Sequence, residues 1–252
     1  MRKKRVDIIC MGCSKNLVDA ELLAKQLEEN GFETNFDPTK SSAKIVVINT
    51  CGFIGHAKEE SINQILAFAE KRKQGKIDKL LVMGCLSGRY KEELTQEIPE
   101  VDKYYGKFSW KEVVADLGGE YRPQCAHTHK LSTPAHYAYV KISEGCNRRC
   151  AYCAIPSIRG KYRSRPMKAI LREARALIAS GCRELNVVAQ DPMLWREKGS
   201  GIGDQGSGDM KTLYIDDICV DEKHRGHRRR GGRLLLCHRT PAQAPRRAGD
   251  SL

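Results

Sequence analysis

The chain has 252 residues, 40% of them hydrophobic and 30% charged, with a formal net charge of +13 and eleven cysteines. This length suits one large domain or two smaller ones, and an odd number of cysteines argues against a disulfide framework and for metal ligation in a reducing compartment. No apolar run is long enough to cross a bilayer, and the basic start lacks a secretory apolar stretch, so a cytoplasmic location is expected.

The first half of the chain alternates strand-like and helix-like segments. Apolar runs predict strands at residues 6–11, 45–49 and 79–83, and helical patterns follow them at residues 17–30, 58–73 and 86–97. Gly31, Gly75 and Pro99 stand where helices commonly stop. The alternation predicts an α/β domain with a parallel sheet, here assigned to residues 1–122.

A cysteine follows each of these three predicted strands: Cys13, Cys51 and Cys85. The carboxyl ends of parallel strands open on one edge of the sheet, where ligands bind. Taken singly, each cysteine is more simply an inert buried thiol. At three equivalent strand ends they form a candidate ligand set.

Residues 123–136 are polar and read as a linker between two domains. Cys125, His127 and His129 lie in it, and short Cys/His tracts can bind metal. Such tracts need a partner fold to become sites, so the linker interpretation is preferred.

The second half opens with a strand at residues 137–143, then a loop bearing Cys146, Cys150 and Cys153 in the run EGCNRRCAYCAIP. A helix at residues 168–179 and a strand at residues 184–190 follow. Iron-sulfur clusters usually take four thiolates, so three on one loop leave one iron open to a small molecule. A structural zinc site is the alternative, but it would need a fourth ligand.

The stretch AYVKISEGCNRRCAYCAIPSIRGKYRSRP resembles the cluster loop of the radical S-adenosylmethionine (SAM) enzymes, and within them the methylthiotransferases. The resemblance implies a four-iron four-sulfur cluster on Cys146, Cys150 and Cys153, whose open iron binds SAM. It also implies that Tyr152 lies near the adenine of SAM. Without the resemblance, Tyr152 reads equally well as a partly buried loop aromatic.

The segments GCSKNLVDAE, NTCGFIGHAKEESINQIL and GCLSGRYKEELTQEIPEVD resemble the RimO branch of the methylthiotransferases. The resemblance covers residues 6–191 and implies a second four-iron four-sulfur cluster on Cys13, Cys51 and Cys85, which carries the transferred sulfur. It implies methylthiolation of the β-carbon of an aspartate in the twelfth protein of the small ribosomal subunit, through a radical made by reductive SAM cleavage. It further implies an electron donor such as flavodoxin or ferredoxin. The tRNA-modifying MiaB branch is the alternative.

Residues 137–194 supply only two strands of a barrel that needs about six strand-helix units, by analogy with the eight of a full barrel. We therefore expect an incomplete radical SAM barrel, and a non-catalytic iron-sulfur-binding fragment is the alternative function. Gln190 and Asp191, at the end of a barrel strand, are candidate SAM contacts. Arg159, Arg163 and Arg165 are candidate partners of a carboxylate, or simply a solvated basic loop.

Residues 195–252 depart from the resemblance. Residues 212–226 look like a piece of a GNAT acetyltransferase, and the Arg-rich sequence after them resembles a gene read in the wrong frame, so we expect a fused or frameshifted tail. The last 30 residues hold nine Lys and Arg against one Asp, and such a tail could contact RNA or the ribosome. Core packing is expected for Cys10, which lies in a strand run, and for Cys182, which follows Gly181 at a helix end. Cys219 and Cys237 show no spacing that suggests chemistry.

Overall fold

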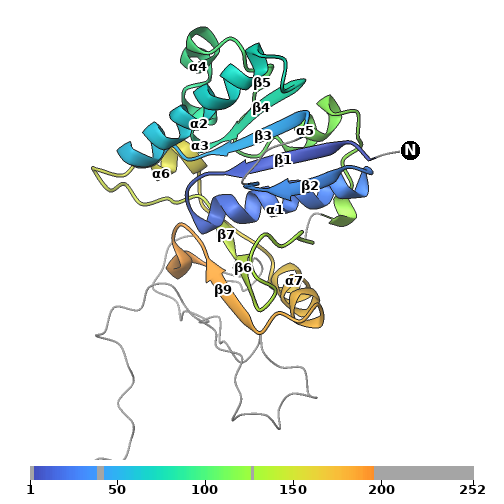
Figure 1. Cartoon of the computed structure of the whole chain (residues 1–252). Helices are drawn as coiled ribbons and strands as arrows, with labels where there is room; N and C mark the ends of the chain where they lie inside the picture. Colours follow the sequence, from blue (N-terminus) through green and yellow to red (C-terminus); the bar gives the residue numbers. More distant parts are fainter. Residues whose placement is uncertain (1–2, 39–42, 126–127, 196–252) are drawn as a thin grey trace, which may run out of the picture.

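The computed structural model describes residues 3–38, 43–125 and 128–195. Figure 1 shows a larger amino-terminal unit and a smaller carboxyl-terminal unit packed against it. The amino-terminal unit consists of β1 (Arg5–Cys10), α1 (Ser14–Glu29), β2 (Glu33–Phe36), β3 (Ile45–Thr50), α2 (Gly55–Lys73), β4 (Lys79–Gly84), α3 (Cys85–Arg89), α4 (Lys91–Glu97), β5 (Lys103–Tyr104) and α5 (Trp110–Asp116). The tail, including the acetyltransferase-like segment, Cys219 and Cys237, lies outside the described residues.

The sheet of the amino-terminal unit is fully parallel, in the order β2-β1-β3-β4-β5. The three predicted strands are its central members, which confirms the prediction of a parallel α/β domain. The order is that of a doubly wound sheet, in which β1 and β3 flank the point where the strand order reverses. The loops after β1 and β3 therefore open into the crevice where ligands of such sheets bind.

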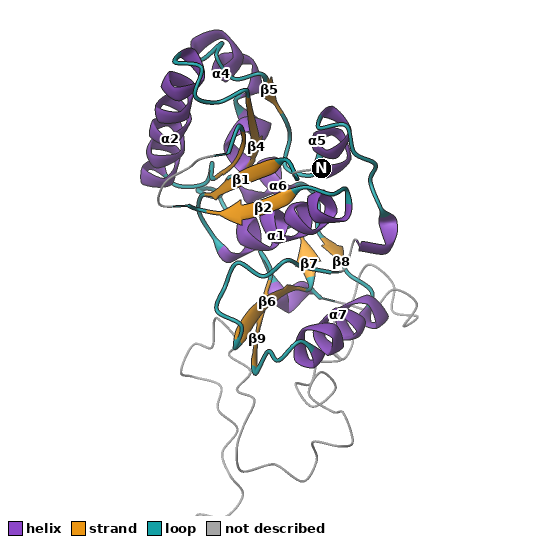
Figure 2. Cartoon of the chain, turned by 45° about the vertical axis from the view of Figure 1, so that its right-hand side comes forward, coloured by secondary structure: helices purple, strands orange, loops and turns teal. Residues whose placement is uncertain are grey.

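Helices cover both faces of this sheet, as Figure 2 shows. On one face, Ile65 of α2 and Leu94 of α4 pack against the strands. On the other face, Leu23 of α1 and Val113 of α5 do so. The central strands are buried on both faces, which explains why they read as continuous apolar runs rather than alternating ones.

Two details of the amino-terminal unit differ from the prediction. The helix expected at residues 86–97 is two helices, α3 and α4, because Tyr90 between them has φ −121° and ψ 36°. The edge strands β2 and β5 were not predicted. Strand β2 reads ETNF, and β5 has only two residues, so neither carries an apolar run.

The carboxyl-terminal unit is built on β6 (Tyr137–Lys141) and β9 (Glu184–Val188), which pair in parallel. Helix α7 (Met167–Ala179) packs on them through Ile170, Ala174 and Leu177. Between β6 and α7 the chain forms β7 (Ser143–Glu144), α6 (Ile155–Arg159) and β8 (Arg163–Ser164). A strand, a helix and a parallel strand match the predicted first part of a barrel, and the short elements α6, β7 and β8 were not predicted.

The segment expected to be a linker is packed between the two units. The side chain of His129 is fully buried, with Nδ1 3.1 Å from Glu21 Oε2 and Nε2 2.9 Å from Glu173 Oε1. Glu21 belongs to α1 and Glu173 to α7, and Ser132 also bonds Glu21. His129 therefore ties the amino-terminal unit to the carboxyl-terminal unit. His127 lies outside the described residues.

Candidate iron-sulfur sites

The loops after β1 and β3 touch each other beside the first two predicted ligands. Gly12, which precedes Cys13, has φ +96°, and a Cβ added to it would lie 2.6 Å from Cys51 Cβ and 2.9 Å from Cys51 Sγ. Only glycine adopts this conformation readily and admits so close a neighbour. Gly12 therefore lets the backbone before Cys13 rest directly on Cys51.

The loop after β4 closes the same site. A Cβ at Gly52 would lie 2.8 Å from the backbone of Leu86 and 2.9 Å from that of Cys85. Gly84, which precedes Cys85, has φ +110°, and a Cβ there would lie 2.5 Å from Thr50 O. The segments that carry Cys51 and Cys85 are therefore in direct backbone contact, as the parallel sheet predicted.

Asn16, on the first turn of α1, joins the three loops. Its Nδ2 donates to Met11 O at 3.0 Å and to Thr50 O at 2.8 Å, and its Oδ1 lies 3.6 Å from Cys85 Sγ. Its own carbonyl accepts from Asn49 Nδ2 at 2.8 Å. Sequence reasoning missed Asn16, although its place three residues after Cys13, in GCSKN, marks it. We call Cys13, Cys51 and Cys85, gathered in this way, the first triad.

The thiols of the first triad differ in their burial. Cys13 is exposed, whereas Cys51 and Cys85 are buried. Burial raises the pKa of the Cys85 thiol to about 11, while the guanidinium of Arg159 opposes that rise. A bound cation would stabilise the thiolate in the same sense. The three thiols thus fit an iron-sulfur cluster reached from the side of Cys13.

The second triad is Cys146, Cys150 and Cys153, in the loop between β7 and α6. Cys146 is buried and its N–H donates to Gly160 O at 3.1 Å, while Cys153 N–H donates to Cys150 O at 3.1 Å. The N–H of Arg148 points to Cys146 Sγ at 3.4 Å. Gly145, just before Cys146, has φ +76°. Backbone bonds therefore shape this loop, and N–H donation to a thiolate suits a cluster ligand.

The remaining predicted site residues lie around the second triad. Asp191, buried and three residues after the end of β9, is paired with Nε of Arg148, which brings the segment after that strand to the cysteine loop. Gln190 Oε1 is buried and has no hydrogen-bond partner among the described residues. Tyr152 is 93% exposed. Arg148 was not singled out from the sequence, although its position between Cys146 and Cys150 was a signal.

The three arginines named from the sequence have different surroundings. Arg159 is buried and paired with Asp19 and Glu144. Arg165 is paired with Glu173. Arg163 is exposed, with its guanidinium 5.9 Å from the ring centre of Phe108. Two of the three are therefore structural partners of buried carboxylates rather than a solvated basic loop.

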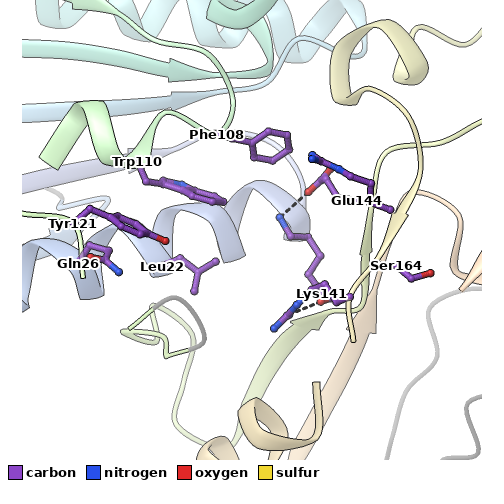
Figure 3. Close-up of a pocket in the computed structure, with 10 residues that line it drawn as sticks. Leu22, Gln26, Phe108, Trp110, Tyr121, Lys141, Glu144 and Ser164 are labelled. Atoms are coloured by element: carbon purple, nitrogen blue, oxygen red, sulfur yellow. Dashed lines mark hydrogen bonds and ion pairs between the residues drawn. The ribbon is translucent and has the colours of Figure 1, made fainter. Parts of the chain in front are cut away.

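A cavity of about 450 Å³ lies between the two units (Figure 3). Phe108, Trp110 and Tyr121 line it from the amino-terminal unit, and Lys141 and Glu144 line it from the carboxyl-terminal unit. Lys141 Nζ lies 2.8 Å from Glu144 Oε2. The cavity is therefore an aromatic and charged space beside the buried side chain of Arg159.

Among residues 3–38, 43–125 and 128–195, no three His, Cys, Asp or Glu side chains converge on a point that would hold a single metal ion. Within that same part of the chain, no helix is long and apolar enough to cross a membrane.

The other cysteines that the structure describes stand apart from the triads. Cys10 is half-buried at the end of β1, and burial, followed by the charge of Asp37, raises the pKa of its thiol. Cys125 and Cys182 are buried. Cys182 packs in the core of the carboxyl-terminal unit, as its position after Gly181 suggested.

Comparison with family models divides the chain at the same place as the structure. Residues 5–106 match the model of the uncharacterized protein family UPF0004. Residues 140–202 match that of the radical SAM superfamily. Each triad thus falls within one matched region.

Curated relatives match the chain across both regions. Over 191 residues it is 56% identical to the ribosomal protein uS12 methylthiotransferase RimO of Parabacteroides distasonis. The matched stretch covers 76% of this chain and 44% of that protein. Over 184 residues it is 52% identical to the RimO of Prosthecochloris aestuarii, and the matched stretch covers 73% of this chain and 42% of that protein. The chain thus spans less than half the length of the curated relatives it matches.

Among solved structures, the chain resembles the radical SAM methyltransferase TsrM of Kitasatospora setae, with tryptophan and a SAM analogue bound. The TM-score is 0.47 at 14% identity, over 76% of this chain and 48% of that one. This likeness is too distant to bear on the site.

Proposed function

We propose that the chain performs the chemistry of the RimO methylthiotransferases, because it matches the UPF0004 and radical SAM family models and is 56% identical over 191 residues to one of these enzymes. The substrate is the ribosomal protein uS12, and the product carries a methylthio group on the β-carbon of an aspartate. The proposal is supported above all by the backbone contacts that bring together the segments bearing Cys13, Cys51 and Cys85.

Each triad would hold one four-iron four-sulfur cluster. The second triad leaves one iron for SAM, and when bound the cluster supplies the electron that cleaves this cofactor. Cys146, Cys150 and Cys153 provide the ligands, and the Arg148–Asp191 pair fixes their loop against β9. Gln190, whose buried Oε1 lacks a partner among the described residues, would orient SAM together with Asp191 and Tyr152.

The first triad would hold the sulfur that is transferred. Gly12, Gly52 and Asn16 hold the segments of Cys13, Cys51 and Cys85 together, so the chain itself would orient the ligands. An electron donor of the flavodoxin or ferredoxin class would serve the reaction, and the basic tail would contact RNA or the ribosome.

The test is anaerobic reconstitution of the purified chain with ferrous ion and sulfide. We expect about eight irons per chain and charge-transfer absorption, then 5′-deoxyadenosine when SAM and a reductant are added. A peptide bearing the target aspartate of uS12 should gain the mass of a methylthio group. Cys182→Ala, which removes a buried cysteine outside both triads, is the matched control and should change none of these results. Absence of bound iron would contradict the proposal.

A second candidate is iron-sulfur binding without transfer. The observation that favours it is the sheet of β6 and β9, which has only two strands among the described residues and leaves strand edges unpaired. This candidate predicts full iron loading with no 5′-deoxyadenosine. Reductive SAM cleavage by the purified chain would exclude it.

A further inference from the structure

Four buried charged side chains form a closed ring between the two triads. Arg159 Nη2 lies 3.0 Å from Asp19 Oδ2, and Arg159 Nε lies 3.1 Å from Glu144 Oε1. Lys141 Nζ completes the ring, 2.8 Å from Glu144 Oε2 and also bonded to Asp19 Oδ1. The side chains of Asp19 and Arg159 are each 2% exposed. We call these residues the four-charge ring.

The ring joins segments that carry the two triads. Asp19 is on α1, which begins directly after Cys13. Glu144 ends β7, two residues before Cys146, and Arg159 ends α6, six residues after Cys153. The ring thus connects the first triad with both ends of the second-triad loop.

Further contacts reinforce this connection. Helix α3, which starts at Cys85, packs against α6 (Figure 1). Lys107 Nζ, from the loop after β5, donates to Ile158 O in α6. The centre of the aromatic side chain of Phe108 lies 5.6 Å from the Arg159 guanidinium and 5.9 Å from Lys141 Nζ. Contacts from the amino-terminal unit therefore surround α6 and hold it beside Cys85.

The stability of the ring depends on all four of its charges being present. Two anions and two cations alternate, so the buried group is neutral as a whole. Removing any one member leaves an uncompensated charge in a buried place, which is far more unfavourable than the intact set. A ring with this property favours one arrangement of the two units over looser ones.

We propose that the four-charge ring is the positioning device that sets the distance and orientation between the two cysteine triads. Arg159 and Asp19 are positioning residues, because they act through the segments that carry the ligands. The inference rests on the proposed function in one respect, the need for sulfur held at the first triad to reach a carbon activated at the second.

The test measures thiol exposure in the full chain purified without iron. Each cysteine is labelled with iodoacetamide, and its rate is followed by mass spectrometry. In Arg159→Met, Cys85 should react about tenfold faster or more, because loss of the ring lets α6 move away from α3. Cys182, in the core of the carboxyl-terminal unit, should keep its rate. Loss of the Arg159 charge alone would raise the pKa of Cys85 and slow the reaction, so faster labelling reports opening.

Two variants make the result decisive. Arg159→Lys keeps the positive charge and can meet one carboxylate, so Cys85 should react at a rate between those of wild type and Arg159→Met. Arg175→Met removes an exposed arginine from α7 and should change neither rate. Unchanged labelling of Cys85 in Arg159→Met, or equal acceleration of Cys85 and Cys182 in both Arg159 variants, would overturn the proposal.

A second measurement addresses the triads directly. With iron-loaded and reduced protein, the magnetic coupling between the two clusters should broaden the electron paramagnetic resonance signal of the wild type. That broadening should weaken in Arg159→Met at equal iron content and recover in part in Arg159→Lys. A signal identical in wild type and Arg159→Met would overturn the proposal. If no iron binds at all, the proposed function fails, while the labelling experiment still decides the role of the ring.

Discussion

Replacement of Asn16 by alanine should damage the first triad. Asn16 is 1% exposed, and its amide donates to Met11 O and Thr50 O at 3.0 and 2.8 Å. Alanine leaves both carbonyls buried without that donor, at about 1–3 kcal/mol each. We expect a total loss of about 2–6 kcal/mol, against a stability of about 5–15 kcal/mol for a typical protein.

Urea unfolding of the metal-free chain measures this loss. With a slope of about 2 kcal/mol per molar urea, the midpoint should fall by about 1–3 M. Iron retained after reconstitution should fall as well, because the three loops lose their common partner. Unchanged midpoint and iron content in Asn16→Ala would refute the argument.

Asn30→Ala is the matched control for this prediction. Asn30 follows the carboxyl end of α1, and its Nδ2 also donates to two carbonyls, Gln26 O at 2.8 Å and Glu120 O at 2.9 Å. Because these bonds lie far from the triad, Asn30→Ala should lower the midpoint while leaving the iron content at the wild-type level. Equal iron loss in both variants would show that retention follows general stability.

Gly84→Ala should lower the free energy of unfolding, measured in urea, by about 2–5 kcal/mol, because φ is +110° there and the new Cβ would lie 2.5 Å from Thr50 O. Gly31→Ala is the control: φ is +81° but nothing lies within 4 Å of the new Cβ, so the loss should be about 1–2 kcal/mol. Equal losses in the two variants would contradict the contact argument. Burial lowers the pKa of His129, but hydrogen bonds to Glu173 and Glu21 outweigh it and raise the pKa from 6.5 to about 9. Its stabilisation, on the order of 3 kcal/mol, is therefore complete below pH 6.5 and lost as the pH rises through about 9, and thermal melting between pH 6 and 10 should show a decline that His129→Gln lacks. Joint replacement of Cys146, Cys150 and Cys153 by alanine should lower the iron content from about eight to about four per chain, and a content unchanged by the replacement would exclude the second triad as a cluster site.

The sequence predicted the centre of the amino-terminal unit well because that centre is locally encoded. The apolar runs of β1, β3 and β4 are buried on both faces, and a glycine or proline ends each predicted helix. Parallel pairing then implies that the cysteines after these strands meet, and the structure confirms that their loops touch through Gly12 and Gly52. Ligation of iron by the six cysteines stays a prediction.

Other features could not be read from the sequence because they depend on distant partners. Asp19 meets Lys141 and Arg159 across 122 and 140 residues, and no local pattern marks such a pairing. His129 lies in a polar stretch that was assigned to a linker, yet its side chain is buried and bonded to glutamates of both units. Strand β2 takes its place from its pairing with β1 rather than from its own polar sequence.

The glycines before Cys13, Cys85 and Cys146 all have positive φ, so the thiols they precede are aimed by the backbone before any iron arrives. A chain whose ligands are preorganised loses little conformational entropy when it binds a cluster. Stripping by a chelator should therefore leave an intact scaffold that can be refilled, unlike a zinc finger, which unfolds when its ion is removed.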